Sequence, residues 1–568
     1  MMITLRIASI LALFALCVLP LAATLVLQYP DERHYTDGAM KMLQDHDWLV
    51  PKTPVDDSNH WEPRFKKPPL AYWLTAASFF AFGVTPFAAR LPFLMACLGT
   101  LFLTWKLARR LTGSDTTARL AALILASAPQ FLLAAARSMP DALLTCFLTL
   151  SAYGFLRLIV LEELTLSAFA MAYGGAALAA LSKGLLGVAI VLFAWTFAFF
   201  RKRDTRDVLR LFHWPTLVFA ALSVVAWFAA VFHRHGEAAW QGFFHDQVSY
   251  NLRGSWYSPA WHLPIYASIL AINFLPWSLT SLEIWCRKIR HGLQPSGTLT
   301  SQFDVWGIAR AFILSWTGTL VVVFSLGANL SLRYLMPVAP LLAIYLAQVM
   351  AQAEGVSRVF SPKKLLGIVW GLLIVVLLIG LLIACLWHDV SAASWLLACF
   401  AGALVLMRSG SETERVGVGI LSIFPLLTLA SFPIALPVPG EQIAQSLIEF
   451  ATPKEVPILV AGKPAMASRL RLFLGSPATV VRTARIKGEH LQNYQAFVLP
   501  EEDAEILSLC GYQSRTVAAV PESPPLHRVL AVFGGQTVQR FYERFSERIV
   551  LVTKMPAAQQ LPCRRTSH

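Results

Sequence analysis

The chain has 568 residues, of which 56% are apolar and only 14% are charged, and its mean hydropathy is +0.58. Soluble proteins rarely reach such a composition because their surfaces need more polar side chains, so long apolar runs between short basic clusters indicate an integral membrane protein. The net charge of +14 does not argue for nucleic-acid binding, since the cytoplasmic loops of membrane proteins collect Lys and Arg.

Apolar runs of near-spanning length predict about thirteen transmembrane helices. The first run lacks a small-residue cleavage pattern, so we interpret it as an uncleaved helix and not as a signal peptide. The predicted spans are 3–28, 87–105, 117–136, 142–160, 166–182, 184–200, 213–232, 263–284, 307–326, 334–352, 365–387, 391–407 and 416–436. The cysteines show no metal-ligand spacing, and most lie inside these runs, where packing is the expected role.

The apolar run 70–82 is too short to span and is broken by Gly83 and Pro86, which predicts a helix lying in the membrane interface. If this run does not span, five basic clusters lie on the same side of the membrane. The positive-inside rule predicts that this side is cytoplasmic. These clusters are at 106–110, 201–206, 287–290, 358–364 and 408–415. The C-terminus then lies on the external face.

Near residue 437 the long apolar runs end and the sequence becomes more polar. Short β-like runs at 456–461, 478–481, 496–499, 516–520 and 549–552 alternate with polar helical stretches. We therefore expect two parts, a membrane domain at 1–436 and an external α/β domain at 437–568 without a catalytic motif. The predicted fold class is an α-helical polytopic membrane protein with juxtamembrane helices and a C-terminal α/β domain.

This topology places unusual charged and polar residues together at the external membrane surface. Ionisable groups at membrane depth are costly and usually have partners or a function. Any one of these residues alone is explained as well by a role as a membrane anchor, a helix-terminal acid or a local ion pair. Such structural roles do not readily explain why so many charged residues converge on one face. The residues are Asp31, Glu32, Lys66, Lys67, Arg137, Asp141, Lys183, Arg253, His262, Arg333 and Tyr334.

This mixture of residue types suits a lipid-phosphate sugar as the donor. Arg and Lys hold phosphate and stabilise it as a leaving group, and a carboxylate orients or deprotonates an acceptor hydroxyl. The sequence contains no Walker loop or dinucleotide fingerprint in a strand–helix setting, which argues against a nucleotide-sugar donor.

Several segments in a common order carry a family resemblance. They include Tyr29 to Glu32, Asp47 to Pro51, Phe65 to Trp73, Ala88 to Pro92, Ala136 to Asp141, Leu181 to Gly184, His262 to Pro264, Leu275 to Trp277 and Arg333 to Pro337. With these segments the chain resembles the polytopic C-type glycosyltransferases, in the branch of protein O-mannosyltransferases and lipid A aminoarabinose transferases. The Asp31–Glu32 start, the Lys67-Pro-Pro-Leu70 segment and the external C-terminal domain are most similar to the aminoarabinose transferases.

The resemblance implies an inverting transfer from an undecaprenyl-phosphate sugar at the periplasmic face of the bacterial inner membrane. Lipid A phosphate is the favoured acceptor. Asp31 would be the main carboxylate, with Glu32 beside it, and Asp141 would organise a phosphate-binding cluster. That cluster would comprise Lys67, Arg137, Lys183, Arg253 and Arg333, with Tyr334 and His262 at the same site.

Two positions depart from the family pattern. The segment after Phe324 and Ser325 has Asn329 where a Lys is common, and no clear Glu-His pair precedes Arg253. The alternatives that stay open are a protein or envelope-glycan acceptor and, from another class, a lipid-linked sugar flippase. The sequence assigns no cofactor, and a divalent cation shared by Asp31 and Asp141 stays open as well.

Overall fold

The computed structural model describes most of the chain, and every structural statement below concerns the described residues. These are 5–24, 32–58, 60–184, 186–244, 258–290, 301–327, 330–352, 361–386, 390–435, 458–461, 464–475, 480–483, 486, 490, 494, 496–500, 504, 512–521 and 546–554.

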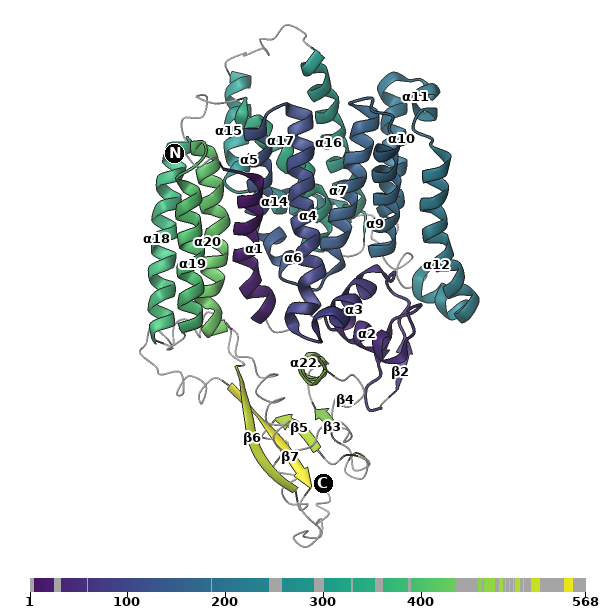
Figure 1. The fold of residues 1–568 in the computed structure, drawn as a ribbon, viewed down its shortest axis with the longest axis vertical. Helices are drawn as coiled ribbons and strands as arrows, with labels where there is room; N and C mark the ends of the chain where they lie inside the picture. The colour runs from purple at the N-terminus through teal and green to yellow at the C-terminus, as the bar shows by residue number, and fades with distance from the viewer. Residues whose placement is uncertain are drawn as a thin grey trace.

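The helices account for most of these residues and form a bundle (Figure 1). In its first half they are α1 (Ile7–Thr24), α2 (Glu32–Asp45), α3 (Leu70–Phe82), α4 (Pro86–Thr112), α5 (Asp115–Ala126), α6 (Pro129–Ala135), α7 (Pro140–Ile159), α8 (Leu166–Phe169), the π-helical turn η1 (Ala170–Gly174), α9 (Gly175–Lys183), α10 (Leu186–Lys202), α11 (Thr205–Leu209) and α12 (Trp214–Trp240). In its second half they are α14 (Ser258–Asn273), α15 (Trp277–Arg290), α16 (Ser301–Ser325), the 3-10 helix η3 (Leu332–Val338), α17 (Ala339–Ala351), α18 (Pro362–Leu386), α19 (Val390–Met407) and α20 (Glu412–Ala435).

The predicted spans coincide with helices or consecutive helices. By length and apolarity alone, six helices among the described residues can cross a membrane, or eight when two sharply bent pairs each count as one span. The bent pairs are α5 with α6, at 72°, and α14 with α15, at 104°. The chain is thus a mainly helical protein with several candidate spans, and the count of thirteen stays a prediction.

The apolar helices differ in how far they are buried, as expected for a bundle in lipid. The Pro362–Leu382 stretch of α18 has a hydropathy of 3.0, yet only 28% of it is buried, and Ile368 and Leu378 are exposed. The helix α7, by contrast, is 83% buried. Exposed apolar faces on α18 fit contact with lipid tails, whereas α7 lies at the centre of the bundle.

Glycines let α7 approach the η1–α9 segment closely. A Cβ on Gly154 would lie 2.2 Å from the backbone nitrogen of Ala172, and one on Gly175 would lie 2.6 Å from that of Ser151. The Ser151 hydroxyl also donates a hydrogen bond of 2.7 Å to the Ala172 carbonyl. Small residues at such a crossing bring helix backbones close together in membranes, and here they bring the start of α7 beside the end of α9.

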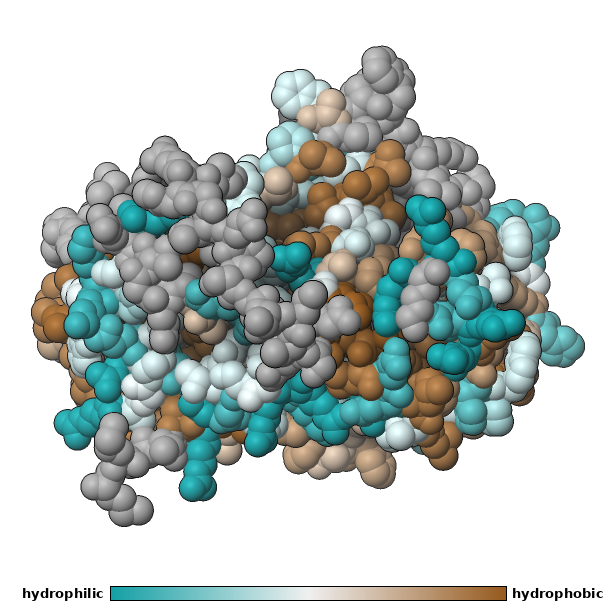
Figure 2. All heavy atoms as spheres, turned by 90° about the horizontal axis from the view of Figure 1, so that it is seen from above, coloured by the Kyte–Doolittle hydropathy of each residue, from teal (hydrophilic) through white to brown (hydrophobic). Residues whose placement is uncertain are grey.

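Two short helices and a hairpin cover one end of the bundle (Figure 1). The helix α3 has the predicted bounds, and it packs with α2, α4 and α9. The strands β1 (Lys52–Pro54) and β2 (Trp61–Pro63) pair antiparallel between α2 and α3. The short helix α11, which carries Arg206 and Asp207, lies at the opposite end of the bundle (Figure 1). Seen from above, the molecule shows hydrophilic side chains interspersed with apolar ones (Figure 2).

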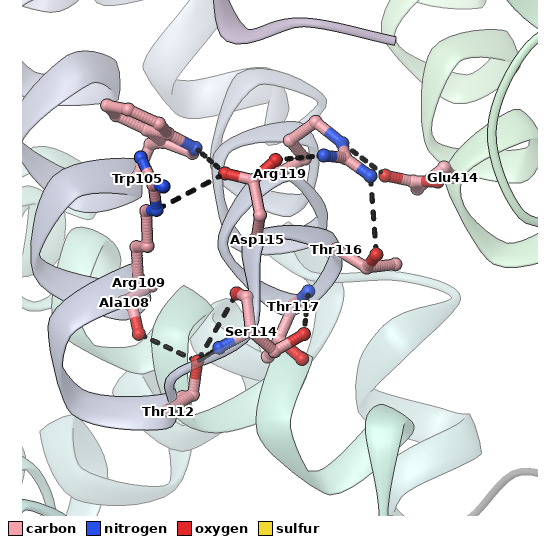
Figure 3. Close-up of polar contacts among 10 residues, drawn as sticks. All are labelled: Trp105, Ala108, Arg109, Thr112, Ser114, Asp115, Thr116, Thr117, Arg119 and Glu414. Carbon is pink, nitrogen blue, oxygen red and sulfur yellow. Dashed lines mark hydrogen bonds and ion pairs between the residues drawn. The ribbon is translucent and has the colours of Figure 1, made fainter. Parts of the chain in front are cut away.

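A polar network fastens α20 to the turn between α4 and α5 (Figure 3). Arg119 donates from Nε to Glu414 at 2.7 Å and also bonds to Asp115. Asp115 accepts from the indole of Trp105 at 3.1 Å, and Arg109 lies 3.8 Å from it. We call these five residues the Asp115 network. It contains two cations and two carboxylates, so its charges balance.

Beyond α20, the described strands form one mixed sheet in the order β4-β3-β5-β7-β6. The strands are β3 (Ile458–Ala461), β4 (Val480–Thr483), β5 (Ala496–Pro500), β6 (Tyr512–Pro521) and β7 (Ser546–Lys554), and α22 (Pro464–Leu474) packs beside them. Each predicted β run overlaps one of these strands. We call β3–β7 with α22 the C-terminal unit. The proposed boundary at residue 437 lies outside the described residues and stays a prediction.

Candidate functional site

The tight packing of α7 on α9 brings two predicted site residues into contact. Asp141 lies in the first turn of α7 and Lys183 is the last residue of α9, and the two side chains form a salt bridge. Both are largely buried, with side-chain exposures of 4% for Asp141 and 13% for Lys183. A carboxylate at a helix start and a cation at a helix end also suit the helix dipoles. The pair therefore has a defined position near the end of the bundle.

Two further predicted cations lie around this pair. Lys67 precedes α3, and Arg333 lies in η3 with Nη1 3.9 Å from the sulfur of Met139. The pKa of Lys67 is lowered from 10.5 to about 8, chiefly by burial and next by repulsion from Lys183, while Asp141 opposes the shift. Lys67, Asp141, Lys183 and Arg333, which we call the cationic cluster, thus combine three cations with one carboxylate.

An aromatic side chain borders the cationic cluster. Tyr334 follows Arg333 in η3, and its ring centre lies 5.1 Å from the ammonium nitrogen of Lys183. The ring also stacks on Phe324 at the end of α16, with 5.3 Å between centroids. A cation over an aromatic face is attracted by the ring quadrupole. Tyr334 therefore helps to hold Lys183 in place, as well as lying within the predicted site.

His262 lies on α14 and reaches the same region through a neighbour. Its ring is 6.4 Å from that of Tyr266, one turn further along the helix. The Tyr266 hydroxyl accepts a hydrogen bond of 3.3 Å from the backbone N–H of Ser331, directly before η3. Among the described residues the buried Nδ1 atom of His262 has no hydrogen-bond partner. His262 thus lies on a helix anchored to η3.

Glu32 belongs to a second buried group, which we call the Glu32 cluster. Its carboxylate pairs with Arg90 of α4, at 3.1 Å to Nε and 3.4 Å to Nη2. It also accepts the backbone N–H of Ser138 at 2.8 Å. Arg90 donates a further bond of 3.1 Å to the Ala22 carbonyl of α1. With these partners Glu32 connects α1, α2, α4 and the start of α7, which is a positioning role.

The segment 137–141 joins the two groups. Ser138 bonds to Glu32, and Asp141, three residues later, pairs with Lys183. The Ser138 hydroxyl additionally donates to the Ala89 carbonyl at 2.9 Å, which fixes the segment on α4. Arg137 is in the same turn, between α6 and α7. The predicted Arg137–Asp141 region is therefore one short, firmly held connection between the Glu32 cluster and the cationic cluster.

Two predicted site residues, Asp31 and Arg253, lie outside the described residues. Glu32, which follows Asp31 in the chain, is described and places the start of α2 beside α4 and segment 137–141. Within the described part of the chain, no group of three or more His, Cys, Asp or Glu side chains could hold a metal ion. The question of a divalent cation at Asp31 and Asp141 stays open.

Sequence reasoning did not assign a role to Arg90 or Ser138. Arg90 is fully buried in α4, and Ser138 is equally buried in the turn before α7. A signal for Arg90 was present, because a charge near the start of an apolar helix needs a partner. Nothing in the sequence indicates that the partner is Glu32, 58 positions away.

Comparison with known proteins supports the family resemblance. A family model described as dolichyl-phosphate-mannose-protein mannosyltransferase matches residues 66–230. An uncharacterized protein of Aquifex aeolicus is 28% identical over 58% of this chain and 62% of its own length. An undecaprenyl phosphate-alpha-4-amino-4-deoxy-L-arabinose arabinosyl transferase of Yersinia pestis is 27% identical over 66% of each chain. The match thus spans less than two thirds of these relatives.

A solved structure extends the likeness in fold over nearly the whole chain. ArnT from Cupriavidus metallidurans bound to undecaprenyl phosphate superposes with a TM-score of 0.67. The superposition covers 98% of this chain and 99% of that one, at 19% sequence identity. Together, the family model, the relatives and this fold confirm the resemblance to the polytopic C-type glycosyltransferases.

Proposed function

We propose that this chain moves a sugar from a polyprenyl-phosphate carrier to an acceptor. It has the fold and sequence features of the polytopic C-type glycosyltransferases. The observation that supports this most is the cationic cluster, in which Lys67, Lys183 and Arg333 surround Asp141 near one end of the bundle. Three cations grouped around one carboxylate at that depth favour the binding of an anion. A phosphate held at headgroup depth by its lipid chain meets this need.

In the proposed reaction, an acceptor oxygen attacks the anomeric carbon of the sugar. The new bond is between that oxygen and the carbon, and the bond from the carbon to the phosphate oxygen breaks. The electron pair leaves with the polyprenyl phosphate, whose growing negative charge Lys183 and Arg333 stabilise. Attack from the opposite side inverts the configuration at the anomeric carbon.

The carboxylates have different proposed roles. Asp141 holds Lys183 against the donor phosphate, and Glu32 holds α2 against segment 137–141. Asp31, which directly precedes Glu32 in the chain, orients the acceptor and accepts a proton when the acceptor is a hydroxyl. A phosphate acceptor arrives ionised and needs no strong base.

The favoured acceptor is a lipid A phosphate, and the favoured sugar is an aminoarabinose. The printed name of the Yersinia pestis relative supports the sugar and its carrier. A protein hydroxyl is the second candidate, and the family model for dolichyl-phosphate-mannose-protein mannosyltransferases supports it. The enzyme would work in the bacterial inner membrane, with the cationic cluster and the C-terminal unit on the periplasmic side, as the basic clusters predict.

The test is sugar transfer by the purified protein in detergent, where transport across a membrane cannot be scored. With a synthetic undecaprenyl-phosphate sugar at saturating concentration, Lys183→Ala and Arg333→Ala should each lower turnover by about 10²–10³-fold. Arg333→Lys should restore part of the activity, because an ammonium lacks the bidentate geometry of a guanidinium. Full turnover in both alanine variants would remove these residues from the site and weaken the assignment of the donor.

A further inference from the structure

A small pocket lies at the end of the bundle away from the cationic cluster, between the ends of α7 and α10 and the short helix α11 (Figure 1). The helix α7 has 20 residues, so the pocket is about 30 Å from Asp141 at its start. The volume of the pocket is about 110 Å³. A buried water needs roughly 10–15 Å³ of such space, so the pocket can take a group of several heavy atoms. Its inner wall is apolar and buried, and consists of Leu158, Ile159, Ala198 and Leu211.

The rim of this pocket carries two cations and two carboxylates. Arg201 Nη2 lies 3.6 Å from Glu162 Oε1, and Arg210 Nη1 lies 3.8 Å from Asp207 Oδ1. Both separations are longer than an N–H···O hydrogen bond. A ligand can therefore bond to these groups without breaking a hydrogen bond within either pair. The rim presents charges of both signs around one small space.

One side of the rim is held firmly by the turn after α7. The Arg201 guanidinium donates from Nη1 to the Ile159 carbonyl, which fixes its place at the end of that helix. Glu162 has a φ of 52°, a left-handed conformation that residues other than glycine seldom adopt. The next residue, Glu163, accepts from Arg157 Nε at 2.7 Å and holds the turn in this shape. Backbone strain of this kind persists where the surrounding structure enforces it, often at ligand sites.

The other side of the pocket is fixed by the π-helical turn η1. The Leu211 carbonyl accepts from the Tyr173 hydroxyl, which in turn accepts from the Trp195 indole at 3.2 Å. Trp195 also stacks on Phe212, with 4.5 Å between centroids. Turns of this type are rare and are frequent at functional sites. The segment that carries Arg210 is thus anchored on η1 and α10, and the pocket is preformed.

Large apolar side chains are exposed on the elements that form the pocket. Leu164, which lines it, is 53% exposed, and Trp214 at the start of α12 is 65% exposed. Phe200 and Leu209, the neighbours of the two rim arginines, are exposed as well. Exposed Trp and apolar side chains beside charged ones are typical of the boundary between acyl chains and headgroups. The pocket therefore lies at the level of lipid headgroups.

We propose that this pocket binds the phosphoethanolamine headgroup of a membrane phospholipid. The phosphate lies against the guanidinium groups of Arg201 and Arg210, which suit it by charge and by fork geometry. The ammonium donates to the carboxylates of Glu162 and Asp207. A rim with equal numbers of cations and carboxylates favours such a zwitterion over a ligand with one sign of charge. A choline headgroup has no N–H to donate, and a glycerol headgroup has no cation.

The experiment measures lipid binding to the purified full-length protein in detergent by native mass spectrometry. The probes are phosphatidylethanolamine, phosphatidylcholine and phosphatidylglycerol with identical acyl chains. The wild type should bind phosphatidylethanolamine about tenfold more tightly than the other two. Arg210→Ala should weaken phosphatidylethanolamine and phosphatidylglycerol alike, by about tenfold. Glu162→Gln should weaken only phosphatidylethanolamine, because the glycerol headgroup has no ammonium.

Two further variants separate the pocket from the basic surface around it. Arg206→Ala removes an exposed arginine of α11 that does not line the pocket, and it should change no lipid affinity. Ala198→Leu fills the apolar wall without changing the charge and should weaken phosphatidylethanolamine by about tenfold. The midpoint of thermal unfolding without lipid shows whether each variant is folded, and Arg210, with a side chain 63% exposed, can be replaced with little risk to the fold. Equal binding of the three lipids to the wild type, or wild-type affinity in Arg210→Ala, would refute the inference.

A soluble ligand with the same chemistry is distinguished by a competition experiment. Free phosphoethanolamine should displace the lipid, but only at concentrations at least about 100-fold higher, because it lacks the acyl chains that add apolar burial. If free phosphoethanolamine binds as tightly as the lipid, the ligand is a soluble metabolite and the assignment to a lipid is wrong. None of these measurements requires sugar transfer, so their outcome is independent of the proposed function.

Discussion

The cationic cluster and the Asp115 network are two groups of charged residues in the bundle, and they differ in charge balance. The Asp115 network pairs two arginines with two carboxylates and links α4 and α5 to α20. The cationic cluster surrounds one carboxylate with three cations, and burial, followed by repulsion from Lys183, lowers the pKa of Lys67 to about 8. A balanced network is complete within the protein, whereas an excess of buried cations is stabilised when an anion binds.

This comparison teaches that burial and ion pairing by themselves do not mark a functional site. Glu414 is as buried as Glu32, and both bond to an arginine and to a backbone N–H. What distinguishes the cationic cluster is its composition, with three cations around one carboxylate. Variants in the two regions should therefore affect different quantities.

The largest effect is expected for Asp141→Asn. The amide keeps the shape but removes the charge that holds Lys183 and makes the cationic cluster more positive. Turnover with a polyprenyl-phosphate donor should fall by about 10²–10³-fold. Asp115→Asn, the same change in the balanced network, should leave turnover per folded molecule unchanged. Equal losses in the two variants would remove the distinction between the regions.

Arg119→Ala should reduce stability without reducing turnover per folded molecule. It leaves Glu414, which is 1% exposed, as a buried carboxylate without its arginine. We expect a loss of about 3 kcal/mol in the free energy of unfolding, measured as a lower midpoint of thermal unfolding in detergent. Arg109→Ala is the matched control, since Arg109 is 59% exposed and 3.8 Å from Asp115, and should cost at most about 0.5 kcal/mol. Similar shifts in both variants would contradict this prediction.

Gly154→Ala tests how the cationic cluster is positioned. The new Cβ would lie 2.2 Å from the Ala172 nitrogen, so α7 and the η1–α9 segment must separate. Overpacking of this kind costs about 1–3 kcal/mol, and the separation should also weaken the Asp141–Lys183 pair. Gly174→Ala is the control, because a Cβ there meets nothing within 4 Å. An unchanged unfolding midpoint in Gly154→Ala would show that this crossing is not tight.

The smallest expected effect is a pH dependence that belongs to the cationic cluster. Lys67 is protonated below its pKa of about 8 and loses its charge as the pH rises through that value. Attraction to the donor phosphate should weaken in the same range, so kcat/KM for the donor should fall by up to about tenfold between pH 7 and pH 9. In Lys67→Arg the fall should disappear, because a guanidinium keeps its charge there. A fall of the same size in Lys67→Arg would assign it to another group.

The helical class and the family resemblance could be predicted from the sequence because each depends on local information. An apolar run of spanning length must become a helix in lipid, since its backbone groups have no other partners. The run that became α3 was too short to span, and its helix has the predicted bounds. Asp141, Lys183 and Arg333 were predicted as parts of one site; the structure places them near Lys67, and their role in a site stays a prediction.

The sequence by itself determined which segments are apolar, which residues carry charge at their ends and which family they resemble. Only the tertiary structure decided which charges meet. It paired Glu32 with Arg90 and Asp37 with Arg471. Helix formation depends on near neighbours in the chain, whereas the partner of a buried charge depends on how closely the helices pack. Gly154 illustrates this, because it lets α7 approach the η1–α9 segment so closely that Asp141 and Lys183 can meet.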